Sequence, residues 1–472
     1  MLSDLNNAST NEDTFSGFDV AIIGAGAAGI TLALKLTSYG KKVALIEAGG
    51  LEYSEDSQQV YRAKTVGDPY FELDAARLRY FGGTTNHWGG WCRTFEPEDF
   101  DRGYLGDEYS WPIGFNDLDR YRVEACEILE ISSEFNDINS IDSEVESIEF
   151  KYSPGPVKFG SKYFVSLVSN PLVHVFLNSN LVNVTYSGER VTSIKVESYN
   201  GNTASISSQN FVFAMGGIEN SRYLLWLQTI YGNSFISDTC PVGRYWMEHP
   251  HFTLGRAIVD KRKVSERFYS ISPQAQIDNS IMNCGFRVEH LNDQGTKALI
   301  KEVQCLAPTL GQSLVSLACK NLVCGALFRA AWEQSPKKQN RIVLDSEQDR
   351  FGIPKPILNW KKSELDRKTL VTSVSKFNEW LLRIDGGRVQ LDQWILNEED
   401  YPLNDELAGN HHMGGTRMHS SKEFGVVDEN CKVYGSSNLY MAGSSIFTTG
   451  GHSNPTLPIV QFSLRLAEHL AT

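Results

Sequence analysis

The sequence predicts a mixed α/β fold with a nucleotide-binding domain and a second domain built on a sheet. Three observations support this prediction. Residues 19–47 read as strand, glycine turn, helix and strand. Runs of alternating apolar residues begin at Val173 and recur further along the chain, as expected for sheets. At 472 residues with 41% hydrophobic content, the chain can bury two separate cores.

The N-terminal unit starts with a continuous apolar run from Val20, which suits a strand buried on both faces. Gly24, Gly26 and Gly29 follow as G-x-G-x-x-G and open a helix, and a second apolar strand ends at Glu47. These glycines permit a tight turn, close approach to a pyrophosphate and close packing of helix on strand. The phosphates would lie at the helix N-terminus, and Glu47 would accept a hydrogen bond from a ribose hydroxyl. The unit therefore predicts a dinucleotide site.

The composition limits which molecules the protein is expected to bind and where in the cell it is expected to act. The net charge of -13 argues against a nucleic-acid partner, whose phosphates need a basic surface. The eight cysteines form no CxxC pair and show no zinc spacing, which indicates reduced thiols and no metal site. Residues 1–16 are polar and acidic, so we expect a flexible tail without a secretion signal, on a cytoplasmic protein.

The most membrane-like stretch runs from Leu314 to Trp332. Lys320, Asn321 and Arg329 interrupt it, so it falls short of a membrane span, and we expect a helix of the second domain instead. A long helix is also expected over residues 363–384, with Ser363 as its N-cap. Alternating apolar residues predict strands within 252–258, 281–288 and 298–306.

The stretch YFGGTTNHWGGWCR, residues 80–93, holds four glycines, two tryptophans and His87. This composition predicts a loop whose backbone lies close to a flat group. The alternative is an aromatic-capped turn in which His87 is a satisfied hydrogen-bonding residue.

Together with the N-terminal unit, FGGTTNHWGG resembles the second flavin-contacting segment of the glucose-methanol-choline (GMC) oxidoreductases, an FAD-dependent family. The similarity is greatest to its pyranose oxidase, choline oxidase and sugar or polyol dehydrogenase branch. The resemblance implies a Rossmann-type FAD-binding domain assembled from separate pieces, and a sheet-based substrate domain laid over the flavin. It implies FAD contacts at Gly82, Gly83, Asn86 and His87. Some members bind the flavin covalently through a histidine at about the position of His87 and others do not, so both alternatives stay open.

Two further segments extend the resemblance. FVFAMGGIENSRYLLWL, residues 211–227, is similar to the family's strand and helix that close over the FAD pyrophosphate, which implies contacts at Gly216 and, in the preceding sheet, at Val182. GRYWMEHPH, residues 243–251, is similar to the family's G-R-x-x-x-[DE]-H-P. His249 and His251 would share one face of a strand, but no third ligand is nearby, so we expect them to be structural.

The segment GNHHMGGTRMHS resembles the family's H-x-x-G-x-x-x-M segment, in which the catalytic histidine lies. Gly414 and Met418 align this form on His411, whereas a tighter H-x-G-G-T form aligns on His412. A neutral histidine suits removal of a hydroxyl proton because its unperturbed pKa of about 6.5 lies near working pH. We favour His411 as the base, and His412 would then shape the pocket.

The second catalytic position of the family corresponds to Asn454, just before the C-terminal helix. An amide cannot act as the base, so Asn454 would hold the substrate oxygen by a hydrogen bond. His452 would line the pocket, donate to a substrate hydroxyl or cap the turn, and we favour the cap. The resemblance also implies that the flavin contacts residues around the start of the helix, namely Gly443, Ser444, Asn454, Pro455 and Thr456.

These observations predict an FAD-dependent oxidation of a CH-OH group in a small hydroxylated substrate such as a sugar, polyol, glycoside or natural-product alcohol. The alternatives are a flavin-binding lyase, a redox-silent flavoprotein or an NAD-dependent dehydrogenase. Oxygen, a quinone or a redox partner would reoxidise the flavin, and no membrane span is expected. The predicted boundaries are a tail at 1–16, an FAD-binding domain at 17–110, 177–250 and 425–472, and a substrate domain at 111–176 and 251–424.

Overall fold

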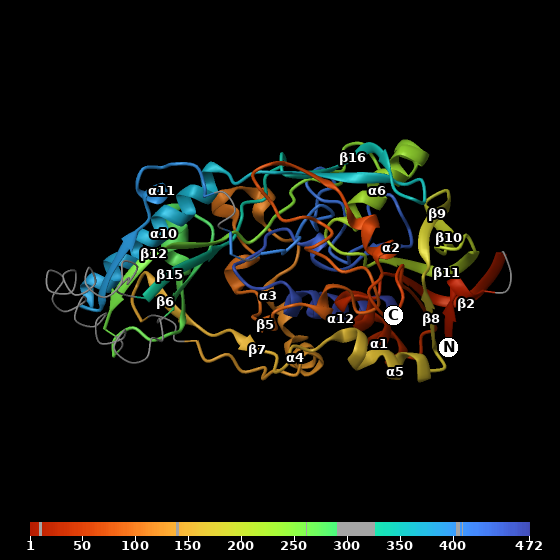
Figure 1. Cartoon of the computed structure of the whole chain (residues 1–472), viewed down its shortest axis with the longest axis horizontal. Coiled ribbons are helices and arrows are strands. Elements are labelled where there is room, and N and C mark those ends of the chain that lie inside the picture. The colour runs from red at the N-terminus through yellow and green to blue at the C-terminus, as the bar shows by residue number, and fades with distance from the viewer. Residues whose placement is uncertain (9–11, 138–140, 261, 290–325, 403–405, 408) are drawn as a thin grey trace, which may run out of the picture.

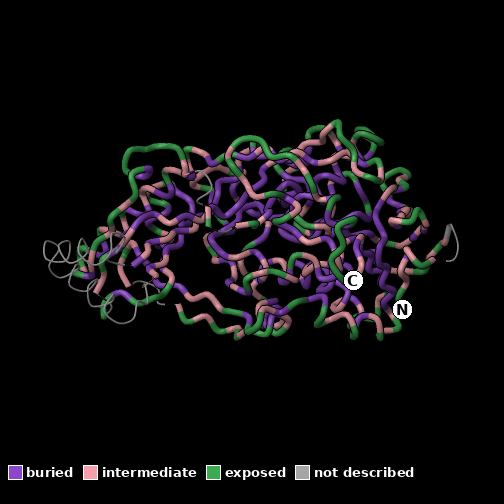
Figure 2. Tube along the Cα trace, viewed as in Figure 1, coloured by how far each residue is buried: buried purple, intermediate pink, exposed green. Residues whose placement is uncertain are grey.

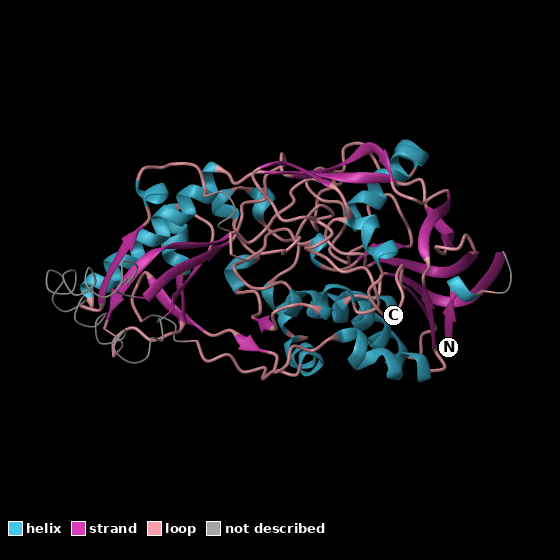
Figure 3. Cartoon of the chain, in the orientation of Figure 1, coloured by secondary structure: helices cyan, strands magenta, loops and turns pink. Residues whose placement is uncertain are grey.

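The computed structural model describes residues 1–8, 12–137, 141–260, 262–289, 326–402, 406–407 and 409–472. The molecule is elongated, with one sheet-based layer at each end and a region of loops between them (Figures 1 and 3). Buried residues run through both ends and through the loops that join them (Figure 2). The chain crosses between the two ends several times, so each domain is built from separate segments.

The larger sheet has eight strands and holds the N-terminal unit. Its parallel part places β2 between β3 and β11, with β8 and then β1 beyond β3, while β19 pairs with β11. The other half of β11 continues as an antiparallel meander with β10 and β9. The strands are β1 Leu2–Asp4, β2 Glu12–Ile23, β3 Val43–Ile46, β8 Val173–Leu177, β9 Asn180–Ser187, β10 Arg190–Glu197, β11 Thr203–Phe213 and β19 Leu439–Met441.

The predicted strand, turn and helix at the N-terminus are confirmed. Val20–Ile23 are buried at the C-terminal end of β2, and helix α1, Ala27–Ser38, starts directly after the glycine turn. Helix α12, Thr456–Ala471, packs along α1, so the last segment of the chain lies beside the first (Figure 1). The carboxyl ends of the parallel strands therefore face the N-termini of both helices, which is where such sheets bind ligands.

The second sheet has six antiparallel strands in the order β18, β12, β15, β14, β13, β6. Helix α10, Glu364–Arg383, covers one face with Leu370, Val374 and Phe377. The strands are β6 Val145–Ile148, β12 His251–Val259, β13 Phe268–Ile271, β14 Cys284–Glu289, β15 Ala326–Trp332 and β18 Gly387–Leu391.

Smaller elements join the two ends. A three-stranded sheet holds β4 Lys64–Gly67, β16 Arg341–Gln348 and β17 Pro354–Trp360, and β5 Trp91–Cys92 pairs with β7 Lys151–Tyr152. The remaining α-helices among the described residues are α2 Glu55–Gln58, α3 Phe115–Asp119, α4 Arg122–Leu129, α5 Phe159–Ser169, α6 Glu219–Tyr231, α7 Pro273–Asn279 and α11 Gln393–Leu396.

The structure corrects two predicted boundaries. Residues 2–7 do not form a flexible tail, because β1 pairs with β8 and the N-terminal ammonium of Met1 donates to the carbonyl of Val173 at 2.7 Å. Most of segment 111–176 belongs with the larger sheet and not with the six-stranded sheet, where the predicted substrate domain would place it. Trp111, for example, stacks on Phe462 of α12, because the apolar sides of α3, α4 and α5 complete the first core. From this segment, β6 alone joins the six-stranded sheet among the described strands.

The apolar stretch 314–332 was expected to be helical, and the prediction is wrong for its described part. Residues 326–332 form strand β15, whose alternate side chains are buried in the second core. The rest of this stretch, and the strand predicted at 298–306, lie outside the described residues. Among the described helices, none is long and apolar enough to cross a membrane.

Candidate active site

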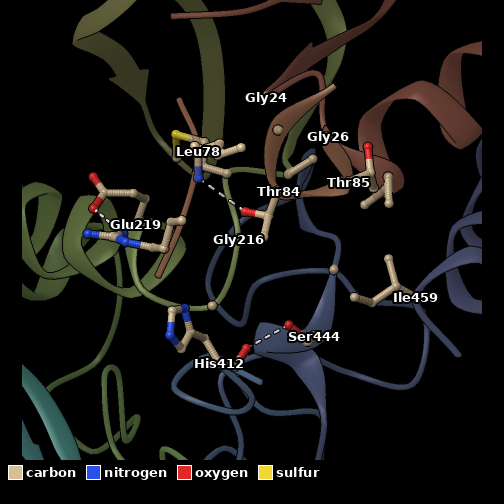
Figure 4. Close-up of a pocket in the computed structure, with 18 of the residues that line it drawn as sticks. Gly24, Gly26, Leu78, Thr84, Thr85, Gly216, Glu219, His412, Ser444 and Ile459 are labelled. Atoms are coloured by element: carbon tan, nitrogen blue, oxygen red, sulfur yellow. Dashed lines mark hydrogen bonds and ion pairs between the residues drawn. The ribbon is translucent and has the colours of Figure 1, made fainter. Parts of the chain in front are cut away.

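A cavity of about 350 Å³ opens where the parallel strands of the larger sheet end. Segments that are far apart in the sequence line it: the first glycine turn, residues 83–90, residues 214–219, residues 409–412 and the start of α12. Figure 4 shows Gly24, Gly26, Gly216, His412 and Ser444 around this space. The later segments for which the resemblance implied flavin contacts, at Gly216, at residues 443–444 and at residues 454–456, therefore all reach this cavity.

The glycines of the first turn differ in what they allow. A Cβ on Gly26 or on Gly216 would meet no atom within 4 Å, so each leaves open space beside the cavity. A Cβ on Gly29 would lie 1.9 Å from the carbonyl oxygen of Gly24, so Gly29 permits packing within the fold. Gly26 is also the N-cap of α1 and has no side chain to bond the free N–H groups there. The open turn and free donors fit a pyrophosphate.

Glu47 ends β3 and lies at the edge of the cavity, 6% exposed. Its carboxylate accepts backbone N–H groups from Ala25 at 2.9 Å and Gly49 at 3.1 Å. Each oxygen keeps a second lone pair, so Glu47 can still accept a ribose hydroxyl while it holds the glycine turn in place.

Some residues of the loop 82–87 line the cavity, and others hold the loop in place. Gly83 and His87 line the cavity, whereas Gly82 and Asn86 do not. Gly82 packs against Gly160, where a Cβ would come within 2.6 Å of the backbone nitrogen, and the Asn86 amide donates to the Phe81 carbonyl at 3.0 Å. His87 is exposed at the edge of the cavity, and partial desolvation of its ring lowers its pKa, so the ring is neutral at pH 7.

The predicted contact at Val182 is displaced by one residue. Leu181 lines the cavity and Val182 does not, because adjacent side chains of a strand point to opposite faces. Gly443, Ser444, Pro455 and Thr456 all line the cavity. The Ser444 hydroxyl donates to the His412 carbonyl at 2.6 Å, which ties the start of the last segment to the histidine pair (Figure 4).

His411 and His412 both line the cavity but face different neighbours. The His412 ring lies among Tyr70 and Trp246, and its Nε2 is buried without a hydrogen-bond partner in the described chain. The His411 ring lies beside the segment that leads into β12, with its Nδ1 2.8 Å from the Nδ1 of His249. Burial lowers the pKa of His411 well below 6.5, so this ring is a neutral imidazole at pH 7.

Glu248, which sequence reasoning did not single out, lies behind the histidines and is fully buried. Its Oε1 accepts the backbone N–H groups of both His249 and His411 at 2.8 Å each. Its other oxygen accepts the hydroxyl of Tyr70. Burial raises the pKa of Glu248 to about 7. This single carboxyl thus connects two segments that lie more than 160 residues apart.

Asn454 lines the cavity just before α12, whereas His452 does not. The His452 ring fills the space left by Gly285 and lies near Phe150. Neither of its ring nitrogens has a hydrogen-bond partner among the described residues, so the predicted role as a turn cap is wrong.

A buried ion-pair network beneath the cavity was also missed. Glu219 accepts from Arg77 at 2.8 Å and from Arg222 at 2.9 Å, and Arg222 also bonds Asp349 at 2.6 Å. Arg77 and Glu219 line the cavity themselves. These partners are scattered along the sequence, and only the fold brings them together. Within the described chain, no group of three His, Cys, Asp or Glu side chains is arranged to hold a metal ion.

Comparison with known families gives two matches. Residues 336–463 match the model of the C-terminal part of the GMC oxidoreductases, and residues 19–55 match an FAD-binding domain. The fructose dehydrogenase large subunit of Gluconobacter japonicus is 22% identical over 95% of this chain and 97% of its own. The 2-methyl-1,2-propanediol dehydrogenase of Mycolicibacterium austroafricanum is 22% identical over 96% of this chain and 95% of its own.

Solved structures share the whole fold. Pyridoxine 4-oxidase from Mesorbium loti superimposes with a TM-score of 0.59 at 15% identity, over 96% of this chain and 99% of its own. A formate oxidase structure superimposes with a TM-score of 0.56 at 13% identity, over 98% of this chain and 99% of its own. At this identity, the similarity establishes the architecture of both ends of the molecule.

Proposed function

We propose that this chain, which belongs to the GMC oxidoreductases and is an FAD-dependent enzyme acting on CH-OH groups, oxidises an uncharged hydroxylated substrate with His411 as base. The observation that carries the proposal is the convergence of three parts on one cavity. These parts are the open turn at Gly26, the neutral ring of His411 and the amide of Asn454.

The donor set fits FAD. Gly26 and Gly216 leave room for a pyrophosphate, Glu47 has free lone pairs for a ribose, and the N-terminus of α12 presents backbone donors to the flavin ring. When bound, FAD supplies the acceptor for the hydride that leaves the substrate carbon.

The residues of the chain supply the remaining steps. The His411 ring takes the proton of the substrate hydroxyl as the C–H bond breaks, so the oxygen becomes a carbonyl. The Asn454 amide donates a hydrogen bond to this oxygen and holds it as negative charge develops. Burial keeps His411 neutral at pH 7, so the ring is ready to accept a proton.

The surroundings of His411 favour an uncharged substrate. Burial lowers the pKa of His249 and of His412 to about 3 each, so both rings are neutral. The Glu248 carboxyl is occupied by two backbone N–H groups and by Tyr70. The two histidine rings therefore offer no charge to a ligand, and the Glu248 carboxyl is already bonded within the chain. The two curated relatives carry the names of enzymes for fructose and for a diol. We therefore propose a sugar or polyol as the substrate.

A panel of substrates tests the proposal. The FAD-loaded enzyme is mixed without oxygen with uncharged sugars and polyols, and with organic acids and amines of similar size, while the visible flavin absorbance is followed. We expect bleaching with at least one uncharged alcohol and none with the charged compounds. Adding oxygen, a quinone or a one-electron dye then identifies the acceptor. Bleaching only by charged compounds, or by NADH alone, would contradict the proposal.

His87 is the residue at which FAD could be attached covalently. His87 lines the cavity, and its neutral ring provides the nucleophilic nitrogen that attachment needs. Acid precipitation of the enzyme distinguishes the alternatives: yellow colour in the pellet indicates a covalent bond, and yellow colour in the supernatant indicates its absence.

A further inference from the structure

His249 follows Glu248 in the segment that leads into β12, and its ring forms hydrogen bonds at both nitrogens. Its Nε2 lies 2.6 Å from the carbonyl oxygen of Gly451, and its Nδ1 lies 2.8 Å from the Nδ1 of His411. His249 is 1% exposed, and burial lowers its pKa to about 3, so the ring carries a single N–H at pH 7.

The position of this one proton follows from the partners. A carbonyl oxygen can only accept, so the Nε2 of His249 must donate to Gly451. The Nδ1 of His249 is then an acceptor, and the Nδ1 of His411 must be the donor to it. A neutral His411 with its proton on Nδ1 has its lone pair on Nε2. That lone pair is the one a base needs.

We propose that His249 is a positioning residue. It donates to the Gly451 carbonyl and accepts from His411, and it thereby fixes His411 in the tautomer whose Nε2 can take the substrate proton. This inference rests on the proposed function, because it takes His411 as the base.

The Gly451 peptide is itself held firmly. Its N–H donates to Oε1 of Glu333 at 2.9 Å, and Oε2 of Glu333 pairs with Arg102 at 2.6 Å. Gly451 has φ +56°, and a Cβ there would lie 2.8 Å from Oδ2 of Asp99, so the position requires glycine. The peptide lies three residues before Asn454. The loop that carries Asn454 therefore also sets the tautomer of the base.

The backbone of His411 is fixed from the same side. Oε1 of Glu248 accepts the backbone N–H groups of His249 and His411, so two adjacent residues, Glu248 and His249, hold the main chain and the ring of His411. When Nε2 takes a proton, the bond from Nδ1 of His411 to His249 becomes charge-assisted and strengthens. His249 should therefore affect the rate of the chemical step more than substrate affinity.

The direct test is 15N NMR of the histidine-labelled holoenzyme at neutral pH, with the His411 signals identified by their loss in His411→Gln. We expect a protonated Nδ1 and a bare Nε2 at His411. A proton on Nε2 of His411 in the wild-type enzyme would overturn the inference, whatever the activities of the variants.

Kinetics supply the second readout. His249→Leu removes the acceptor. We expect the rate of FAD reduction at saturating substrate to fall about 10- to 100-fold, because the loss of one hydrogen bond to a charged group slows a reaction by about this factor. In His249→Asn, whose Oδ1 can accept the same proton, we expect a loss of less than about 10-fold. KM and FAD content should stay nearly constant in both.

A His249→Leu enzyme that reduces FAD at the wild-type rate would overturn the inference. If His411→Gln itself kept the full rate, the proposed base would be wrong, and the tautomer measured by NMR would still report on His249 independently. Should His249→Leu fail to fold, the wild-type NMR result and the His249→Asn variant decide.

Discussion

At the residue scale, two glycines of the same turn serve different purposes. Gly29 lets α1 pack on β2, since any side chain there would collide with the Gly24 carbonyl. Gly26 faces open space with φ -87°, a conformation that any residue can adopt. The G-x-G-x-x-G pattern predicted both positions but could not separate ligand contact from packing, because that difference depends on what lies across from each Cα.

Gly26→Ala should therefore fold normally and lose cofactor. We expect the free energy of unfolding of the apoprotein to change by less than about 0.5 kcal/mol, because the new methyl group meets no atom. The affinity for FAD should fall at least about 10-fold, because the methyl group occupies the path of the pyrophosphate. Flavin fluorescence titration measures the affinity.

The matched control is Gly114→Ala, because Gly114 is also a helix N-cap with φ -98° and does not line the cavity. It should leave FAD affinity unchanged. Equal losses of affinity in the two variants would mean that the turn at Gly26 does not contact the cofactor.

The pH dependence of the reaction should reflect the protonation of one residue, His411. Burial lowers the pKa of His411 well below 6.5, and the neutral ring is the form that accepts a proton. A lowered pKa keeps this form populated at lower pH, so the acid limb of kcat/KM for an uncharged substrate should have its midpoint below pH 6.5. A midpoint at or above 6.5, with FAD retained throughout, would contradict the assignment.

At the scale of elements, the sequence predicted correctly a helix whose start depends on neighbouring residues, and it failed for a strand that depends on distant ones. The helix expected from Ser363 is α10, and its Ser363 hydroxyl accepts the backbone N–H of Asp366 while the Asp366 carboxylate accepts that of Ser363. The apolar stretch before Trp332 was expected to be a helix and forms β15 in its described part, because pairing with β12 and β14 decides between two structures that its composition allows.

Removing the cap of α10 gives a prediction for this element. Ser363→Ala should lower the free energy of unfolding by about 1 kcal/mol, because it leaves the N–H of Asp366 and the hydroxyl of Ser335 without this partner. Urea unfolding measures the change. Ser166→Ala, at an exposed serine of α5, is the control and should change stability by less than about 0.5 kcal/mol. A loss no larger than that of the control would contradict the capping role.

At the scale of the whole molecule, buried charges join the two ends. Arg102, fully buried, pairs with Asp99 at 2.7 Å and with Glu333 at 2.6 Å, just after β15. The same Glu333 accepts the backbone N–H of Gly451, in the loop that leads to Asn454. The sequence contains all these residues but no signal of their contact. For the same reason, motifs in the sequence predicted roles for His411 and Asn454 but gave no sign that Glu248 and His249 contact His411.

Arg102→Met tests this connection. The change leaves two buried carboxylates without their cation, so we expect a loss of about 3–5 kcal/mol in the free energy of unfolding. The exposed pair of Arg62 with Glu55 provides the control, and Arg62→Met should cost less than about 1 kcal/mol. Similar losses in both variants would show that the buried network does not stabilise the junction.

The assignment of His411 as the base is tested most directly by the rate at which substrate reduces bound FAD. This rate is measured for His411→Gln, His412→Gln and the wild-type enzyme in a stopped-flow spectrophotometer without oxygen. A positioned general base contributes about 10²- to 10⁴-fold to such a rate. We predict a loss in this range for His411→Gln with FAD still bound, and a much smaller loss for His412→Gln. A wild-type rate in His411→Gln, or the large loss in His412→Gln alone, would contradict the central claim.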